Sequence, residues 1–280
     1  MRVVVARHAG VCYGVERALR LADEAAQTGG HVTTFGPLIH NPQAVAALEA
    51  KGVAVASRLD DVDGGTLVIR SHGVDPAVIT AAEERGLHVV DATCPFVRAA
   101  HTCAADLAKS GYSVLIVGES DHPEVEGILA HAGGTALIVQ DVADLPAKLP
   151  GKRIGIVVQT TQSLARLQSI VDALLGRVTE LRVCNTICSA TAKRQEAAAV
   201  LADEADVIVV VGGHNSGNTT RLVQICAERN PRTHHVETAE EIDPAWFAGA
   251  TTVGVTGGAS TPDVQIRGVI DAIEALDSGS

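Results

Sequence analysis

The sequence predicts an α/β fold in which short parallel strands alternate with surface helices. Short β-branched runs recur along the chain, and between them apolar residues stand three or four positions apart. The first pattern is typical of buried strands and the second of helices with one apolar face, and their alternation favours parallel sheets. The expected strands are Val3–Ala6, Val32–Phe35, Thr66–Ile69, His88–Val90, Val114–Val117, Ala136–Val139, Ile154–Val158, Val207–Val211 and Val253–Thr256. The expected helices include Val15–Gln27, Ala44–Ala50, Leu164–Leu175, Ala190–Asp203 and Val264–Leu276.

Composition limits the class of protein. The 280 residues, 46% of them apolar, are enough for two or three structural units with a sizeable core. The net charge of −11 and the small number of aromatic residues argue against a nucleic-acid partner, which needs a basic stripe and stacking faces. Apolar runs such as Val207–Val211 are far shorter than the roughly 18 residues of a membrane helix. Val3–Ala6 is also too short for a signal peptide, so we expect a cytoplasmic protein without membrane contacts.

Three of the six cysteines stand at comparable places. Cys12, Cys94 and Cys188 each precede a helical pattern, and the separations between them are close to one third of the chain. A helix start favours the thiolate form, and three thiolates suit a soft metal centre. Spacing alone gives equal weight to the alternative that these are buried thiols.

We interpret the other three cysteines as packing residues. Cys103 and Cys226 lie within helical patterns among small apolar residues, where a cysteine usually acts as a small hydrophobe. Cys184 forms C-x3-C with Cys188, a looser spacing than that of metal knuckles. Because a reducing cytoplasm disfavours disulfides, the even number of cysteines carries no meaning in this interpretation.

Polar segments follow or adjoin six of the predicted strands. Because ligands of open α/β sheets bind beyond the carboxyl ends of strands, these segments are expected to line one polar cavity. Five prolines mark helix starts, whose N–H groups suit an anion, although ordinary helix starts explain the same pattern. No P-loop is present. The segments are His40–Pro42, Ser71–Gly73, Asp121–Glu124, Gln159–Thr161, Gly212–Asn218 and Ala259–Pro262, and the prolines are Pro42, Pro76, Pro95, Pro123 and Pro262.

A series of motifs extends this pattern from Cys12 to Asp263. In order they are Cys12-x-Gly14-Val15-x-Arg17-Ala18, His40-Asn41-Pro42, His72-Gly73-Val74, Asp91-Ala92-Thr93-Cys94-Pro95, His122-Pro123-Glu124-Val125-Glu126-Gly127, Gln159-Thr160-Thr161, Ile187-Cys188-x-Ala190-Thr191, Arg194-Gln195-Glu196, Asn215-Ser216-x-Asn218 and Gly258-Ala259-Ser260-x-Pro262-Asp263. Through them the sequence resembles the 4-hydroxy-3-methylbut-2-enyl diphosphate reductases, iron–sulfur enzymes that end the non-mevalonate isoprenoid pathway.

The resemblance implies three similar α/β units in a pseudo-threefold arrangement around a central cluster. The implied units are residues 13–94, 95–188 and 189–280, with the N-terminal strand 1–12 joining the third. One [4Fe–4S] cluster, expected as [3Fe–4S] or lost after oxidation, would be held by Cys12, Cys94 and Cys188. One iron would then lack a cysteine and bind the substrate hydroxyl.

The implied reaction is a reductive dehydroxylation. Two electrons and two protons convert (E)-4-hydroxy-3-methylbut-2-enyl diphosphate to isopentenyl and dimethylallyl diphosphate. By resemblance, Glu124, His122 and Thr160 are the catalytic residues near the hydroxyl, and burial would keep Glu124 protonated so that the hydroxyl departs as water. The implied substrate-binding residues are His40, His72, His122, Thr160, Ser216, Gly217, Asn218 and Ser260.

Two further positions, Gly217 and Glu126, lie within these motifs or beside their polar residues. Many relatives have a serine where this sequence has Gly217, so we expect a backbone N–H to replace part of that contact and to tune affinity. Glu126 is interpreted as a surface or structural carboxylate.

The resemblance implies ferredoxin or flavodoxin as electron donor. Since such carriers are acidic, docking needs a local basic patch, and the basic residues near the cluster cysteines in sequence are candidates. Solvated helix charges are an equally good interpretation. The candidates are Arg17, Arg20, Arg98, Lys193 and Arg194.

Two alternatives remain open. One is a zinc-dependent hydrolase or zinc-stabilised phosphate-binding protein that uses the same thiols with His122 or His40. The other is a non-catalytic relative that keeps the fold, against which the intact Glu124 and the three cysteines argue.

Overall fold

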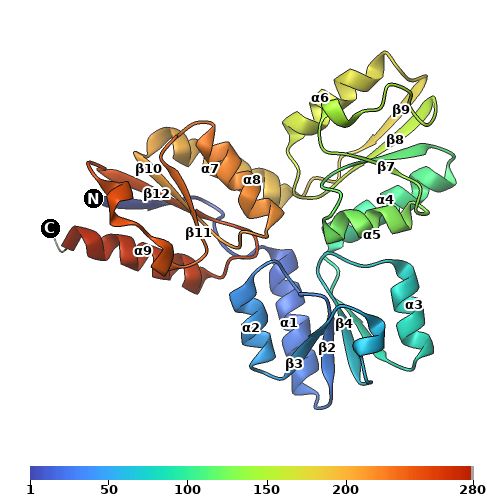
Figure 1. Cartoon of the computed structure of the whole chain (residues 1–280), viewed down its shortest axis with the longest axis horizontal. Coiled ribbons are helices and arrows are strands. Elements are labelled where there is room, and N and C mark those ends of the chain that lie inside the picture. Colours follow the sequence, from blue (N-terminus) through green and yellow to red (C-terminus); the bar gives the residue numbers. More distant parts are fainter. Residues whose placement is uncertain (279–280) are drawn as a thin grey trace. The chain divides into compact units, whose positions relative to one another are not determined.

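The computed structural model describes residues 1–278 and contains, within them, three four-stranded sheets (Figure 1). Every strand pair is parallel. The strand orders are β1 (Arg2–Val5), β12 (Thr252–Gly257), β10 (Val207–Val211), β11 (Thr233–Val236); β3 (Val53–Ala56), β2 (Val32–Phe35), β4 (Thr66–Ile69), β5 (His88–Asp91); and β7 (Leu137–Val139), β6 (Ser113–Val117), β8 (Arg153–Val158), β9 (Glu180–Cys184). The predicted α/β class with three similar parts is confirmed.

The chain forms two compact units. The first comprises residues 1–15, 40–44 and the chain from 189 onward, and it contains the sheet in which β1 pairs with β12. The second comprises residues 16–39 and 45–188 and contains the other two sheets. The predicted limits of three domains and their pseudo-threefold arrangement stay predictions.

The helices begin where the sequence places them. Pro42, Pro76, Pro95 and Pro123 are each the first residue of a helix, where the missing N–H costs nothing, and Pro262 directly precedes one. The helices are α1 (Tyr13–Gln27), α2 (Pro42–Glu49), α3 (Pro76–Glu84), α4 (Pro95–Lys109), α5 (Pro123–His131), α6 (Leu164–Leu175), α7 (Ser189–Glu204), α8 (Gly217–Ala227) and α9 (Asp263–Ser278). Short 3₁₀ turns lie at Leu59–Asp61, Val142–Asp144, Ala239–Glu241 and Pro244–Phe247.

All nine predicted strands are present, and three further strands, β3, β9 and β11, each lie at the edge of a different sheet. An edge strand needs less continuous apolar sequence because it has a neighbour on only one side. β9, with the sequence ELRVC, is an example, since three of its five side chains are exposed.

The core is built on the central strands. All five residues of β10 are buried, and β6 and β8 are buried over most of their length. These buried strands fix the loops at their carboxyl ends, where the polar segments lie. No helix among the described residues is long and apolar enough to span a membrane.

The prediction that Cys103 and Cys184 are packing thiols is wrong. Cys103 on α4 and Cys184 at the end of β9 form a disulfide between residues 81 positions apart. Sequence spacing cannot reveal such a pair, because only the packing of α4 on the β6–β8–β9 sheet brings the two together. Cys226 is the buried packing residue that the sequence predicts, and burial raises the pKa of its thiol to about 11.

Candidate active site

Cys12, Cys94 and Cys188 are the residues immediately before α1, α4 and α7. None of them belongs to the disulfide. The N–H of Cys94 donates to the carbonyl of Ser71 (2.9 Å), and that of Cys188 to the carbonyl of Thr160 (3.0 Å). In the first unit the N–H of Cys12 donates to the carbonyl of Ala259 (3.0 Å). Each cysteine is thus tied to another polar loop, at a helix end whose dipole stabilises negative charge.

In the second unit, Glu124 lies in the first turn of α5 with 2% of its surface exposed. The N–H of Thr160 donates to its Oε1 (2.6 Å), and the Thr160 hydroxyl donates to its Oε2 (2.9 Å). Burial raises the pKa of Glu124 to about 7, although both bonds from Thr160 oppose the rise. Near neutral pH this carboxyl therefore exists in both protonation states, as a proton donor requires.

His122 is the N-cap of α5. Its Nδ1 accepts the N–H of Glu124 (3.1 Å), so in the neutral ring this bond assigns the proton to Nε2. Through Glu124 and Thr160, the hydrogen bonds continue to the N–H of Cys188. The predicted acid, its two neighbours and one predicted cluster cysteine therefore form one connected group.

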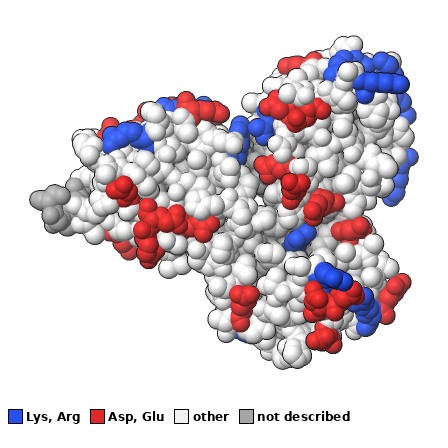
Figure 2. Space-filling model, viewed as in Figure 1, with Lys and Arg blue, Asp and Glu red and all other residues white. Residues whose placement is uncertain are grey.

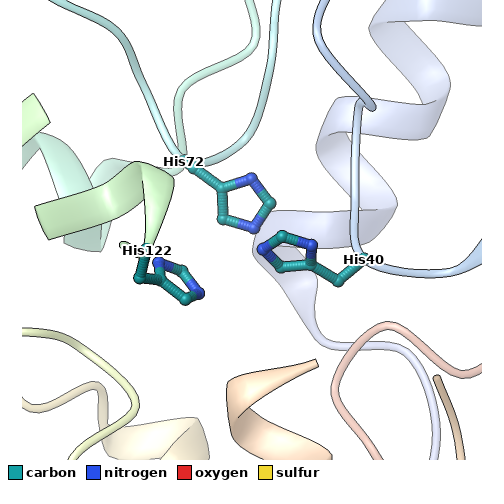
Figure 3. A group of neighbouring side chains, drawn as sticks. All are labelled: His40, His72 and His122. Carbon is teal, nitrogen blue, oxygen red and sulfur yellow. The ribbon is translucent and has the colours of Figure 1, made fainter. Parts of the chain in front are cut away.

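His72 follows β4, and its ring meets that of His122 edge to face with centroids 5.5 Å apart. Figure 3 labels both side chains; His40, which it also labels, is a residue of the first unit. Gly73 has φ +72°, and a Cβ there would lie 2.4 Å from Cε1 of His101. Glycine is therefore required in the turn that carries His72.

The loop after β10 in the first unit carries a buried polar side chain that lacks hydrogen-bond partners among the described residues. Ser216 caps α8 by accepting the N–H of Thr219 (3.3 Å), and Gly217 is the first helical residue. Asn218 is only 5% exposed, and neither its Oδ1 nor its Nδ2 has a hydrogen-bond partner among the described residues. Because buried amides are rarely left without partners, this helix start fits a polar or anionic ligand.

Ser260 follows β12 in the same unit, and its hydroxyl donates to the carbonyl of His40 (3.0 Å). The side chain of Asn41 donates to Oε1 of Gln265 (3.0 Å) and accepts the N–H of Ala44 (2.8 Å). The backbone of the His40 segment is therefore fixed against the loop and helix that follow β12.

One predicted docking arginine is not a surface residue. Arg194 is 3% exposed, and its Nη2 donates to the carbonyl of Gly10 (2.7 Å). Arg17 is half-buried and donates weakly to the carbonyl of Thr93, directly before Cys94. Both arginines thus support cysteine loops.

The other charged candidates lie on the surface. Arg20 pairs with Glu24 (2.6 Å) and Arg98 with Asp91 (2.8 Å), while Lys193 is exposed. On the face drawn in Figure 2, Lys and Arg form small groups among scattered Asp and Glu. Consistent with its interpretation as a surface carboxylate, the Glu126 side chain is 62% exposed and lies 3.7 Å from Arg70.

His101 is a neighbour of this site that belongs to none of the sequence motifs. It lies on α4, 4% exposed, and its ring stacks on that of His131 with centroids 4.1 Å apart. Burial lowers the pKa of His101 to about 3, so the ring is neutral. Because Gly73 and Gly127 both lie against it, His101 packs between the His72 turn and the helix of Glu124.

Comparisons with known proteins identify the family of this chain. A family model described as LytB protein matches residues 3–274. The 4-hydroxy-3-methylbut-2-enyl diphosphate reductase of Geobacter sp. (strain M21) is 52% identical over 99% of this chain and 98% of its own length. The enzyme of the same name from Pelobacter propionicus is 51% identical over 99% of both chains.

Two solved structures share the fold. One, described as (E)-4-hydroxy-3-methyl-but-2-enyl diphosphate reductase, the terminal enzyme of the non-mevalonate pathway, has a TM-score of 0.72 and 44% identity over 98% of this chain and all of its own. The other, the E-1-hydroxy-2-methyl-but-2-enyl-4-diphosphate reductase from Plasmodium falciparum, has a TM-score of 0.91 and 28% identity over 96% of this chain and 87% of its own. The chain therefore belongs to the LytB family, the family of 4-hydroxy-3-methylbut-2-enyl diphosphate reductases that its motifs predict.

Proposed function

We propose that the chain reduces (E)-4-hydroxy-3-methylbut-2-enyl diphosphate to isopentenyl and dimethylallyl diphosphate. The allylic C–O bond breaks, two electrons and two protons are consumed, and the hydroxyl leaves as water. The observation that carries the proposal is the connected group of His122, Glu124, Thr160 and Cys188, which joins a buried proton donor to a predicted cluster ligand.

The donor set fits an iron–sulfur cluster. Cys12, Cys94 and Cys188 lie outside the disulfide and occupy the same place before three helices, as three thiolate ligands require. When bound, a [4Fe–4S] cluster with these three ligands would supply electrons and one iron without a cysteine. The zinc alternative loses support, because the named relatives are reductases.

Glu124 supplies a proton in this proposal. Its carboxyl is held by both donors of Thr160, so the acid has one fixed orientation. Because hydroxide is a poor leaving group, protonation of the departing oxygen lowers the barrier. His122, whose neutral ring carries its proton on Nε2, would orient the substrate beside this acid.

The diphosphate would be bound without Lys or Arg. Asn218, whose amide lacks partners among the described residues, would bond the anion together with the Gly217 N–H and the Ser216 hydroxyl. The side chains of His40, His72 and Ser260 complete the proposed set.

Ferredoxin or flavodoxin would supply the electrons, and the cytoplasm would be the place of reaction. Of the five basic candidates, Arg20, Arg98 and Lys193 keep exposed side chains that an acidic carrier can reach.

Anaerobic purification followed by iron, sulfide and zinc analysis tests the proposal. We expect iron and sulfide in equal amounts, and oxidation of reduced methyl viologen when the allylic diphosphate is added. Zinc without sulfide would support the hydrolase alternative instead.

Single replacements of Cys12, Cys94 and Cys188 by serine should each lower both iron content and turnover, since each removes one cluster ligand. Cys226→Ser is the matched control, because Cys226 lies in an apolar core and should leave the iron content unchanged. Wild-type iron and turnover in the three serine variants would contradict the ligand assignment.

A further inference from the structure

We propose that the Cys103–Cys184 disulfide is a second redox site of this chain, opened and closed by exchange with a protein dithiol. In its closed form it clamps together the two segments that carry Cys94 and Cys188. The expected effect on iron retention rests on the proposed function, whereas the redox chemistry of the disulfide does not.

The positions of the two cysteines explain why the disulfide would act as a clamp. Cys103 is on α4, the helix whose N-cap is Cys94. Cys184 ends β9, and only residues 185–187 separate it from Cys188. The disulfide therefore joins, within the second unit, the element that begins at one predicted cluster ligand and the element that leads to another.

Apart from the disulfide, the β9 end is held by its pairing with one strand, by hydrogen bonds of two residues beyond it and by the packing of Ile187 on the core. β9 is an edge strand paired only with β8. Beyond it, Thr186 donates to the carbonyl of Val158 and accepts its N–H (2.9 Å), and Cys188 donates to Thr160 (3.0 Å). Because an edge strand opens more readily than a central one, a covalent link to α4 limits its local opening.

The disulfide is accessible enough for exchange. Both cysteines are half-buried against the core that includes Ala100 and Leu107. The neighbours of Cys184, Val183 and Asn185, are exposed, so an attacking thiolate can approach from that side. Exchange requires this kind of access to one sulfur.

A protein dithiol would open the disulfide in two exchange steps. A thiolate of the partner dithiol attacks one sulfur, the Cys103–Cys184 bond breaks, and a mixed disulfide forms. The partner's second thiol then displaces the remaining cysteine. Overall the partner becomes a disulfide, while Cys103 and Cys184 receive two electrons and two protons; exchange with an oxidised partner reverses the reaction.

Opening would have two consequences for the cluster segments. The tie between α4 and β9 is lost, and a thiol appears at Cys184, four residues before Cys188 in a C-x3-C arrangement. That thiol competes with Cys188 for iron, whereas the closed disulfide keeps it away. We therefore expect the open form to lose iron faster.

Thiol counting tests the redox site without reference to activity. Protein purified anaerobically without reductant is treated, while folded, with a dithiol protein. It is then unfolded in the presence of a chelator and alkylated, and its mass is measured by mass spectrometry. We expect four alkylated cysteines before the treatment and six after it. Six before treatment, or four after it, would overturn the proposal.

Iron release into a chelator tests the clamp. We expect release to be about fivefold faster from C103S/C184S than from the wild type, the effect of a weakened local closure, and faster still from C103S, which keeps the competing Cys184 thiol. C226S is the matched control and should match the wild type, since it removes a buried thiol in the other unit. A double variant with wild-type release would overturn the clamp.

The two proposals fail in distinguishable ways. If the wild type binds no cluster, the proposed function fails, and thiol counting still decides whether the disulfide undergoes exchange. If the wild type binds the cluster and turns over, but C103S/C184S retains iron as C226S does, only the clamp fails.

Discussion

The loops after β6 and β10 occupy equivalent places but differ in how their polar groups are satisfied. Each follows a central strand and opens a helix with a polar N-cap, His122 in one case and Ser216 in the other. After β6, the carboxyl of Glu124 receives two hydrogen bonds from Thr160. After β10, the amide of Asn218 has no partner among the described residues. The carboxyl of Glu124 is thus already bonded within the protein, whereas the amide of Asn218 is left for a ligand, as the proposed anion site requires.

Removal of the acid should give the largest effect. Glu124→Gln keeps the shape and the hydrogen bond from the Thr160 N–H, but it cannot donate the carboxyl proton. We expect turnover to fall by about 100-fold or more, within the range for general acids, while iron content and substrate binding persist. Steady-state kinetics and iron analysis measure this. Glu126→Gln, an exposed neighbour, is the control, and an unchanged rate in Glu124→Gln would remove Glu124 from the mechanism.

The same carboxyl should make stability depend on pH. Its pKa rises from 4.5 to about 7 on folding, so it is neutral in both states below pH 4.5. Between pH 4.5 and about 7 the unfolded state ionises while the folded carboxyl stays largely protonated, so the free energy of unfolding falls by about 3 kcal/mol over this range and changes little above it.

Urea unfolding of the wild type and Glu124→Gln from about pH 4 to about pH 8 measures this loss as the pH-dependent difference between their free energies of unfolding. His101, whose pKa is lowered on folding, affects both proteins equally and cancels. Parallel pH profiles would show that the carboxyl is not desolvated.

Replacement of Asn218, in the proposed anion site, should affect substrate binding without lowering stability. Asn218→Ala removes an amide that has no partner in the ligand-free protein, so we expect the free energy of unfolding to stay the same or increase. If the amide bonds the substrate, KM should rise by roughly tenfold, the cost of one hydrogen bond to a charged group. A loss of stability with an unchanged KM would show that the Asn218 amide supports the fold and does not bind the substrate.

The smallest effect is expected at the first residue of α8. Gly217→Ser adds a hydroxyl at a helix start that accepts serine, so stability should change little. We expect KM to fall by about twofold to fivefold, since one further weak hydrogen bond becomes available. Kinetics with the allylic diphosphate measure it, and a higher KM would show that the glycine N–H alone fits the anion better.

Much of this contrast is invisible in the sequence. The motifs contain Glu124, Thr160 and Asn218. They do not reveal that Glu124 and Thr160 are hydrogen-bonded to each other, whereas the Asn218 amide lacks a partner among the described residues. The edge strand β9 is missed because its sequence, ELRVC, carries little continuous apolar sequence. The sequence predicts Arg194 as an exposed charge on a helix, yet its side chain is buried and donates to the carbonyl of Gly10.

The sequence by itself determined the α/β class, the helix starts at proline and the family. These depend on local periodicity and on motifs in a fixed order, which need no knowledge of distant contacts. The tertiary structure alone decided that Cys103 pairs with Cys184, that Arg194 is buried and that burial raises the pKa of Glu124. Each of these depends on which residues far apart in the chain come together, and so on how much water each group loses on folding.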